Sequence, residues 1–139
     1  MKLEDSVLLL LLKFDRAEDI SKALNVRVED VKHVLRKLEA EGFVQSRKKG
    51  FLIKREVFEL TKAGFERATE IKSELEKFAR ELERMYEREP ERVKEVVGEN
   101  ALLLPLLITF GLINLPLLSM LAELNEVHDF EFDFDSVEF

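Results

Sequence analysis

The sequence of 139 residues contains no cysteine and no tryptophan, and it has only five glycines, three prolines and two histidines. The absence of cysteine excludes disulfides and thiol nucleophiles, and it is typical of proteins of reducing compartments. The two histidines lie far apart, and no glycine-rich phosphate loop is present. We therefore expect neither an enzyme nor a metal or cofactor site. The apolar run at 7–12 is too short for a signal peptide, so we expect a cytoplasmic protein.

Basic residues are scarce in the second half of the chain. Residues 1–62 hold 14 Lys and Arg against 11 Asp and Glu, a net charge of +3, whereas residues 63–139 hold 8 against 18, a net charge of −10. The length suits about one domain with an attached arm. Because the two parts differ in sign, we expect the first part to face a polyanion and the second to be held away from it.

Residues 19–60 follow the order of a winged helix-turn-helix. An Asp-x-x-Glu capping box at 15–18 predicts a first short helix, which Asn25 ends. A second helix ends at Gly42, and it carries a continuous apolar stripe formed by Val28, Val31, Val34, Leu35 and Leu38. In this motif the second helix is the one that enters the major groove of DNA.

The face of the second helix opposite its apolar stripe supplies candidate DNA contacts, namely Arg27, Lys32, His33, Arg36 and Lys37. Arg27 begins the helix, where it cannot cap the free N–H groups and opposes the helix dipole. Two interpretations stay open: Arg27 reaches a phosphate or a guanine edge, or the position tolerates any residue. The acids Glu29 and Asp30 in the first turn offset the dipole, but they would weaken affinity for phosphates.

A basic hairpin is predicted after Gly42. Residues 43–47 and 55–60 alternate as two strands, and Lys48-Lys49-Gly50 is either their turn or the start of a longer wing. Arg47, Lys48 and Lys49, helped by Lys54 and Arg55, are the candidates for contacts with the DNA backbone. The alternative is a basic turn that only aids solubility. The apolar residues 51–53 fit that alternative poorly, because they need something to cover them.

Several positions of this region form a recognisable pattern: Leu24-Asn25-Val26, Val31, Leu35, Leu38-Glu39, Gly42-Phe43-Val44, and Leu60-Thr61 with Gly64. Over residues 4–66 the chain resembles the winged helix-turn-helix transcription regulators of the MarR and PadR type. The resemblance implies a DNA-binding regulator that acts as a homodimer. One departure is Arg27, which stands where such proteins usually have Ser or Thr.

Residues 63–89 are predicted to form a long helix without a breaker. Its apolar positions recur at intervals of three and four, as in a coiled coil, and comprise Ile71, Leu75, Phe78, Leu82 and Met85. Regulators of the resembled type commonly dimerise through such a helix, so we assign these residues to dimerisation. The alternative is that the helix packs on the domain's own core.

Residues 90–124 are predicted to form an apolar helical arm, in which 101–122 contain no charge. This length suits a transmembrane span, but Pro105, Gly111 and Pro116 favour short buried helices that break near Pro105 and between Gly111 and Pro116. The first helix also favours burial, because its leucines at 8–12 point to every side and need cover. We therefore expect a soluble, intertwined dimer in preference to a membrane anchor.

The last segment, 125–139, contains alternating phenylalanines and acids from 130 to 135, which predicts a strand. It could equally be an acidic tail or a mimic of nucleic-acid charge that occupies the wing. Taken together, the sequence predicts a mainly α fold with a small β-hairpin, and double-stranded DNA as the partner. The alternative function is a winged-helix protein-interaction module, tethered to a membrane through 101–122. The sequence indicates no particular small-molecule effector.

Overall fold

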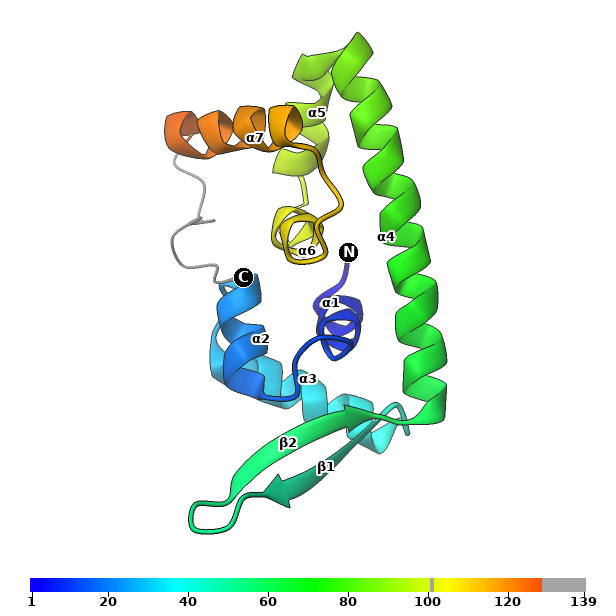
Figure 1. Ribbon diagram of the computed structural model, residues 1–139, viewed down its shortest axis with the longest axis vertical. Helices are drawn as coiled ribbons and strands as arrows, with labels where there is room; N and C mark the ends of the chain where they lie inside the picture. Colours follow the sequence, from blue (N-terminus) through cyan, green and yellow to red (C-terminus); the bar gives the residue numbers. More distant parts are fainter. Residues whose placement is uncertain (101, 129–139) are drawn as a thin grey trace.

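The computed structural model describes residues 1–100 and 102–128, with side chains described as far as residue 121. Figure 1 shows α4 along one side of the molecule, with α1 and α6 between it and α2, and the hairpin at one end. The elements of the described chain are α1 (Leu3–Leu10), α2 (Ala17–Leu24), α3 (Val28–Ala40), β1 (Val44–Lys49), β2 (Arg55–Leu60), α4 (Lys62–Arg88), α5 (Pro90–Gly98), α6 (Leu103–Thr109) and α7 (Leu115–His128).

The predicted helix-turn-helix is present in α2 and α3. Asn25 ends α2 in the left-handed conformation, and the stripe of α3 from Val31 to Leu38 is buried in the core. The capping box at 15–18 does not form, because Arg16 is the N-cap residue of α2 and makes no capping bond. Instead, the Asp15 carbonyl accepts a hydrogen bond of 2.7 Å from the Phe58 amide, which ties the start of α2 to the hairpin.

The Leu-Thr-x-x-Gly pattern joins the base of the hairpin to α4. Thr61 caps this helix, since its Oγ1 accepts from the Gly64 amide at 3.1 Å and donates to the Gly42 carbonyl at 2.7 Å. The Thr61 amide donates to the Phe43 carbonyl at 3.0 Å. At Gly64 an added Cβ would lie 1.9 Å from the Phe43 carbonyl oxygen, so only glycine allows this approach of helix and loop.

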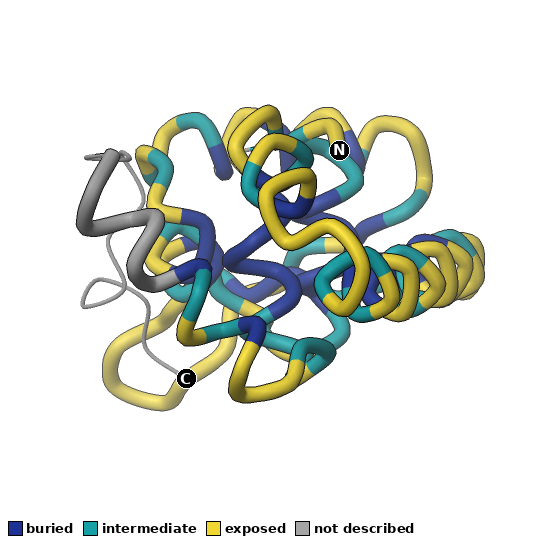
Figure 2. Tube along the Cα trace, turned by 90° about the horizontal axis from the view of Figure 1, so that it is seen from above, coloured by how far each residue is buried: buried dark blue, intermediate teal, exposed yellow. Residues whose placement is uncertain are grey.

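Helix α1 lies at the centre of the core, and its residues from Ser6 to Leu10 are buried. It packs against α3 and α4, while α5 packs against α4 and α6 against α2. The Nζ of Lys13, just after α1, also donates to the Thr109 carbonyl of α6 at 3.0 Å. Figure 2 shows the buried positions gathered in the middle of the molecule. The cover that the leucine-rich first helix requires therefore comes from the same chain.

The apolar seam of α4 faces this core. Ile71, Leu75 and Leu82 are buried, whereas Phe78 and Met85 are partly buried and pack against the core. The single chain therefore uses the seam for its own packing, which is the alternative that the sequence left open. A role of these five residues in dimerisation stays a prediction.

The arm is broken into short helices, as expected. The break near Pro105 lies just before α6. Pro105 is the third residue of this helix, a position whose N–H would have no acceptor within the helix, so a proline is tolerated there. The second break lies between α6 and α7, near Gly111. Within the described residues, none of the helices combines the length and the apolarity needed to span a membrane.

The strand predicted for 125–139 is wrong for its first residues, because 125–128 complete the last turn of α7. A helix that starts at Leu115 continues through this polar stretch, where the alternation of Phe and acids has not yet begun. Residues 129–139 lie outside the described part of the chain.

Candidate nucleic-acid interface

The hairpin runs back along α3, so that its tip and the first turns of α3 point the same way. The Glu39 carboxylate accepts from the amide and the Oγ of Ser46, at 3.2 and 2.6 Å. One turn closer to the helix start, Arg36 donates to Glu56 at 2.6 and 2.7 Å, and Glu56 is the strand partner of Lys48. The tip of the hairpin therefore lies toward the N-terminal end of α3.

Arg36 was predicted to contact DNA, but the structure places it between the helix and the wing. Besides Glu56 it binds Glu39 at 3.3 Å, and its guanidinium lies 5.4 Å from the centre of the Phe58 ring. The hydrogen bonds with Glu56 raise the pKa of Arg36 above its usual value. Arg36 thus holds the hairpin on α3.

Lys37 is similarly engaged within the chain. Its Nζ donates to the Glu4 carboxylate at 2.5 Å, which links α3 to α1. This hydrogen bond lowers the pKa of Glu4 and raises that of Lys37. Two of the predicted DNA contacts are therefore already paired with carboxylates of neighbouring elements.

Arg27 occupies the N-cap position of α3 and makes no capping bond, as expected. Its guanidinium instead donates twice to the Asp30 carboxylate, with both distances at 3.0 Å. The hydrogen bond from Arg27 lowers the pKa of Asp30, so the pair is charged at neutral pH. Sequence reasoning missed this pair, although its spacing of three residues within one helix turn was a usable signal.

Exposed basic side chains that make no ion pair within the described chain gather on the hairpin and on the first turns of α3. Arg47 forms an ion pair with Glu59 across the strands. Within the part of the chain that the structure describes, six other basic side chains at this end are exposed and make no ion pair: Lys32, His33, Lys48, Lys49, Lys54 and Arg55. Of the helix residues expected to contact DNA, only Lys32 and His33 are thus exposed without an ion pair among the described residues. The other exposed basic residues without an ion pair at this end belong to the wing.

The wing is longer than a two-residue turn. Lys48 and Lys49 belong to β1, and the ladder continues to the pair Lys49 and Arg55, so the loop consists of residues 50–54. Its residues Phe51, Leu52 and Ile53 are 96%, 90% and 73% exposed. The cover that these apolar residues need is not supplied by the described chain.

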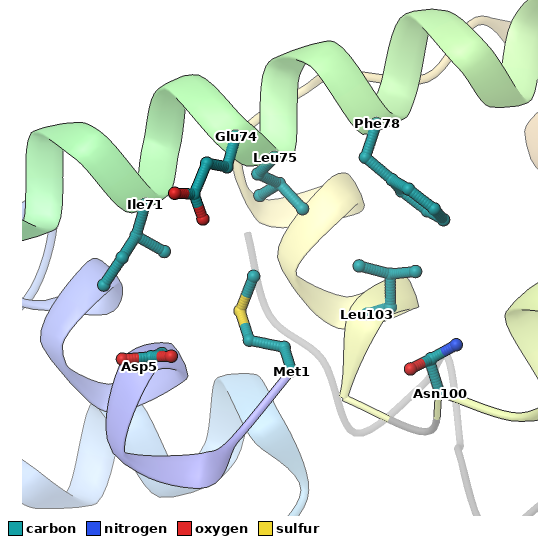
Figure 3. Close-up of a pocket in the computed structure, with 8 residues that line it drawn as sticks. All are labelled: Met1, Asp5, Ile71, Glu74, Leu75, Phe78, Asn100 and Leu103. Atoms are coloured by element: carbon teal, nitrogen blue, oxygen red, sulfur yellow. The ribbon is translucent and has the colours of Figure 1, made fainter.

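A cavity of about 300 Å³ lies elsewhere, where α1, α4 and the start of the arm meet. Figure 3 shows the side chains that line it: Met1, Asp5, Ile71, Glu74, Leu75, Phe78, Asn100 and Leu103. The lining combines apolar groups with two carboxylates, of which Asp5 lies 3.7 Å from Arg67. Among the described residues no cluster of three metal-binding side chains occurs.

Comparison with known proteins supports the fold. No family model matches the chain, and the search of curated proteins gave no match. Among solved structures, the chain is similar to the adhesin competence repressor of Streptococcus pyogenes, with a TM-score of 0.59 and 21% identity over 71% of this chain and 75% of that one. At this identity the likeness shows the fold, and the winged helix expected from the MarR and PadR resemblance is confirmed.

Proposed function

We propose that this protein is a DNA-binding transcription regulator that acts as a homodimer. The recognition helix α3 enters the major groove with Lys32 and His33, and the wing lies on the backbone with Lys48 and Lys49. The observation that carries the proposal is the group of exposed basic side chains at one end of the molecule that make no ion pair with any described residue, in a chain whose net charge is −7. The fold shared with a repressor supports it.

The charge distribution would also orient the protein on DNA. The net charge of −10 in residues 63–139 keeps the long helix and the arm away from phosphates, while the +3 of residues 1–62 faces them. In a two-fold dimer the paired recognition helices would read half-sites about 34 Å apart. Sedimentation equilibrium tests the dimer, and a monomeric species that binds a duplex with full affinity would contradict it.

The direct test is binding of the purified protein to genomic fragments at low salt, followed by salt titration of the retained fragments. A regulator of this kind should retain duplex DNA and release it with a steep salt dependence. If no duplex is retained at low salt, the DNA-binding proposal is wrong and the winged helix serves as a protein-interaction module.

Removing two wing cations should weaken binding in a defined way. For Lys48→Ala combined with Lys49→Ala, we expect affinity for a duplex of about 30 base pairs to fall about tenfold, and the slope of log affinity against log salt to decrease by about two. Fluorescence anisotropy at several salt concentrations measures both. The matched control is Lys77→Ala with Arg80→Ala, which removes the same charge from the exposed face of α4. If both variants lost the same affinity, the loss would reflect the net charge of the protein, and a contact between the wing and DNA would be contradicted.

Releasing Arg27 should strengthen binding. Asp30→Asn removes a negative charge near the phosphates and the partner of Arg27, so we expect duplex affinity to rise about threefold and the salt slope to increase by about one. The same titration measures it. Adding Arg27→Ala to this variant should abolish most of the gain. A gain that survives without Arg27 would mean that the carboxylate alone was responsible.

A further inference from the structure

The tip of the wing presents apolar side chains where the surrounding surface is basic. Phe51 and Leu52 are almost fully exposed, and Ile53 is nearly three-quarters exposed. Because these side chains are exposed, they contribute no free energy of burial to the free protein. Lys48 and Lys49 of β1 precede them, and Lys54 of the loop and Arg55 of β2 follow them. All four are exposed and have no ion-pair partner within the described chain.

The backbone of the tip forms a tight loop. Gly50 has a φ of +126°, and an added Cβ would lie 2.2 Å from the Ile53 carbonyl oxygen, so the loop closes tightly across residues 50–53. The two strands pair in register up to Lys49 and Arg55. Each strand has six residues, which extends the hairpin by about 20 Å. Residues 51–53 therefore lie in the loop that closes the far end of the paired strands, and Figure 1 shows this hairpin projecting from the rest of the molecule.

The basic residues on both sides of the tip favour a polyanion as the partner. The apolar residues favour a polyanion whose interior is apolar and accessible. Duplex DNA has both, since its phosphates lie outside and its stacked bases within. Proteins of several folds insert Phe, Leu or Ile between base steps from the minor groove, which unstacks the step and bends the duplex. The alignment of β1 with α3, through Glu39 and Ser46, brings the tip to the duplex together with the first turns of α3.

We propose that Phe51, Leu52 and Ile53 form an apolar wedge that enters the minor groove, opens a base step and bends the duplex toward the major groove. The flanking lysines bind the phosphates on either side of the opened step. Flexible pyrimidine–purine steps are the expected sites, because they unstack most easily. This inference rests on the proposed DNA-binding function, and it adds a deformation of the DNA that phosphate contacts alone would not produce.

Ring closure of short DNA by ligase tests the wedge without knowledge of the operator. A fragment of about 120 base pairs, shorter than the persistence length, closes slowly on its own. The full-length protein should accelerate closure about tenfold. A variant with Phe51→Ser, Leu52→Ser and Ile53→Ser should bind the same fragment with an unchanged salt slope and lose the acceleration. The Lys48→Ala and Lys49→Ala variant should bind more weakly, but should still accelerate closure at saturating protein.

The outcomes separate the wedge from the DNA-binding function itself. A wild-type protein that binds the fragment without accelerating closure overturns the wedge alone, as does a serine variant that accelerates closure fully. A wild-type protein that fails to bind the fragment at low salt overturns the proposed function as well. Sedimentation with vesicles of phosphatidylserine and phosphatidylcholine that depends on residues 51–53, with ring closure independent of them, assigns the tip to a membrane surface and also overturns the wedge.

Discussion

Gly64→Ala is expected to lower the free energy of unfolding by about 3 kcal/mol, near the upper end of the usual cost of overpacking. A Cβ at this position would lie 1.9 Å from the Phe43 carbonyl oxygen, which belongs to the backbone and cannot rotate away. The substitution must therefore push α4 from the base of the hairpin. That movement would stretch the bond from the Thr61 amide to the same carbonyl, now at 3.0 Å. Urea denaturation followed by circular dichroism measures the loss.

The matched control is Gly111→Ala in the arm. Gly111 has a φ of +62° and no atom within 4 Å of an added Cβ, so this change costs only the backbone strain of about 1 kcal/mol. A loss at Gly64 no larger than that at Gly111 would mean that the close approach to Phe43 does not exist in solution. The difference between the two variants isolates the contact from the general cost of replacing glycine.

Leu106→Ala is expected to lower the free energy of unfolding by about 3 kcal/mol, within the range for a leucine removed from a packed core. Leu106 belongs to α6 and is fully buried. Because α6 packs against α2, a cavity here loosens the arm from the winged-helix part. Chemical denaturation gives the free energy, and a change in its slope with denaturant would report a loss of compactness.

Leu115→Ala provides the control on the same arm. Leu115 begins α7 and is 73% exposed, so the same substitution should change stability by less than about 0.5 kcal/mol. Equal effects at the two positions would contradict the docking of α6 in the core. If the wild-type protein were insoluble without detergent, the docking of α6 would be contradicted more directly. The apolar side chains of α6 would then lie in an environment that is not formed by the chain's own helices.

The local elements could be predicted from the sequence because their signals lie within a few residues. The apolar stripe of α3 from Val31 to Leu38 repeats with the helical period, and it is buried as expected. Asn25 adopts the left-handed conformation that short polar side chains tolerate, and it ends α2 where predicted. Pro105 shows the limit, because a proline is tolerated in the first turn of a helix and disruptive later, so the sequence placed a break near this residue without showing that the break precedes α6.

The candidate interface was predicted less completely, since charge on a helix face does not show which partner it meets. Arg36 and Lys37 have the right spacing for an exposed basic face, yet their partners are Glu56 and Glu4, 20 and 33 residues away. Such long-range pairs depend on how the hairpin and α1 pack against α3. The short-range pair of Arg27 with Asp30 was accessible to sequence reasoning and was overlooked.

The sequence by itself determined the winged-helix order and the basic character of the hairpin, because periodicity and charge are local properties. Only the tertiary structure decided which basic side chains remain unpaired among the described residues, that the seam of α4 packs within its own chain, and that the arm packs against α4 and α2. The physical reason is that an apolar surface requires burial without specifying the partner. The choice between a second copy, a membrane and the chain itself follows from which surfaces the fold brings together.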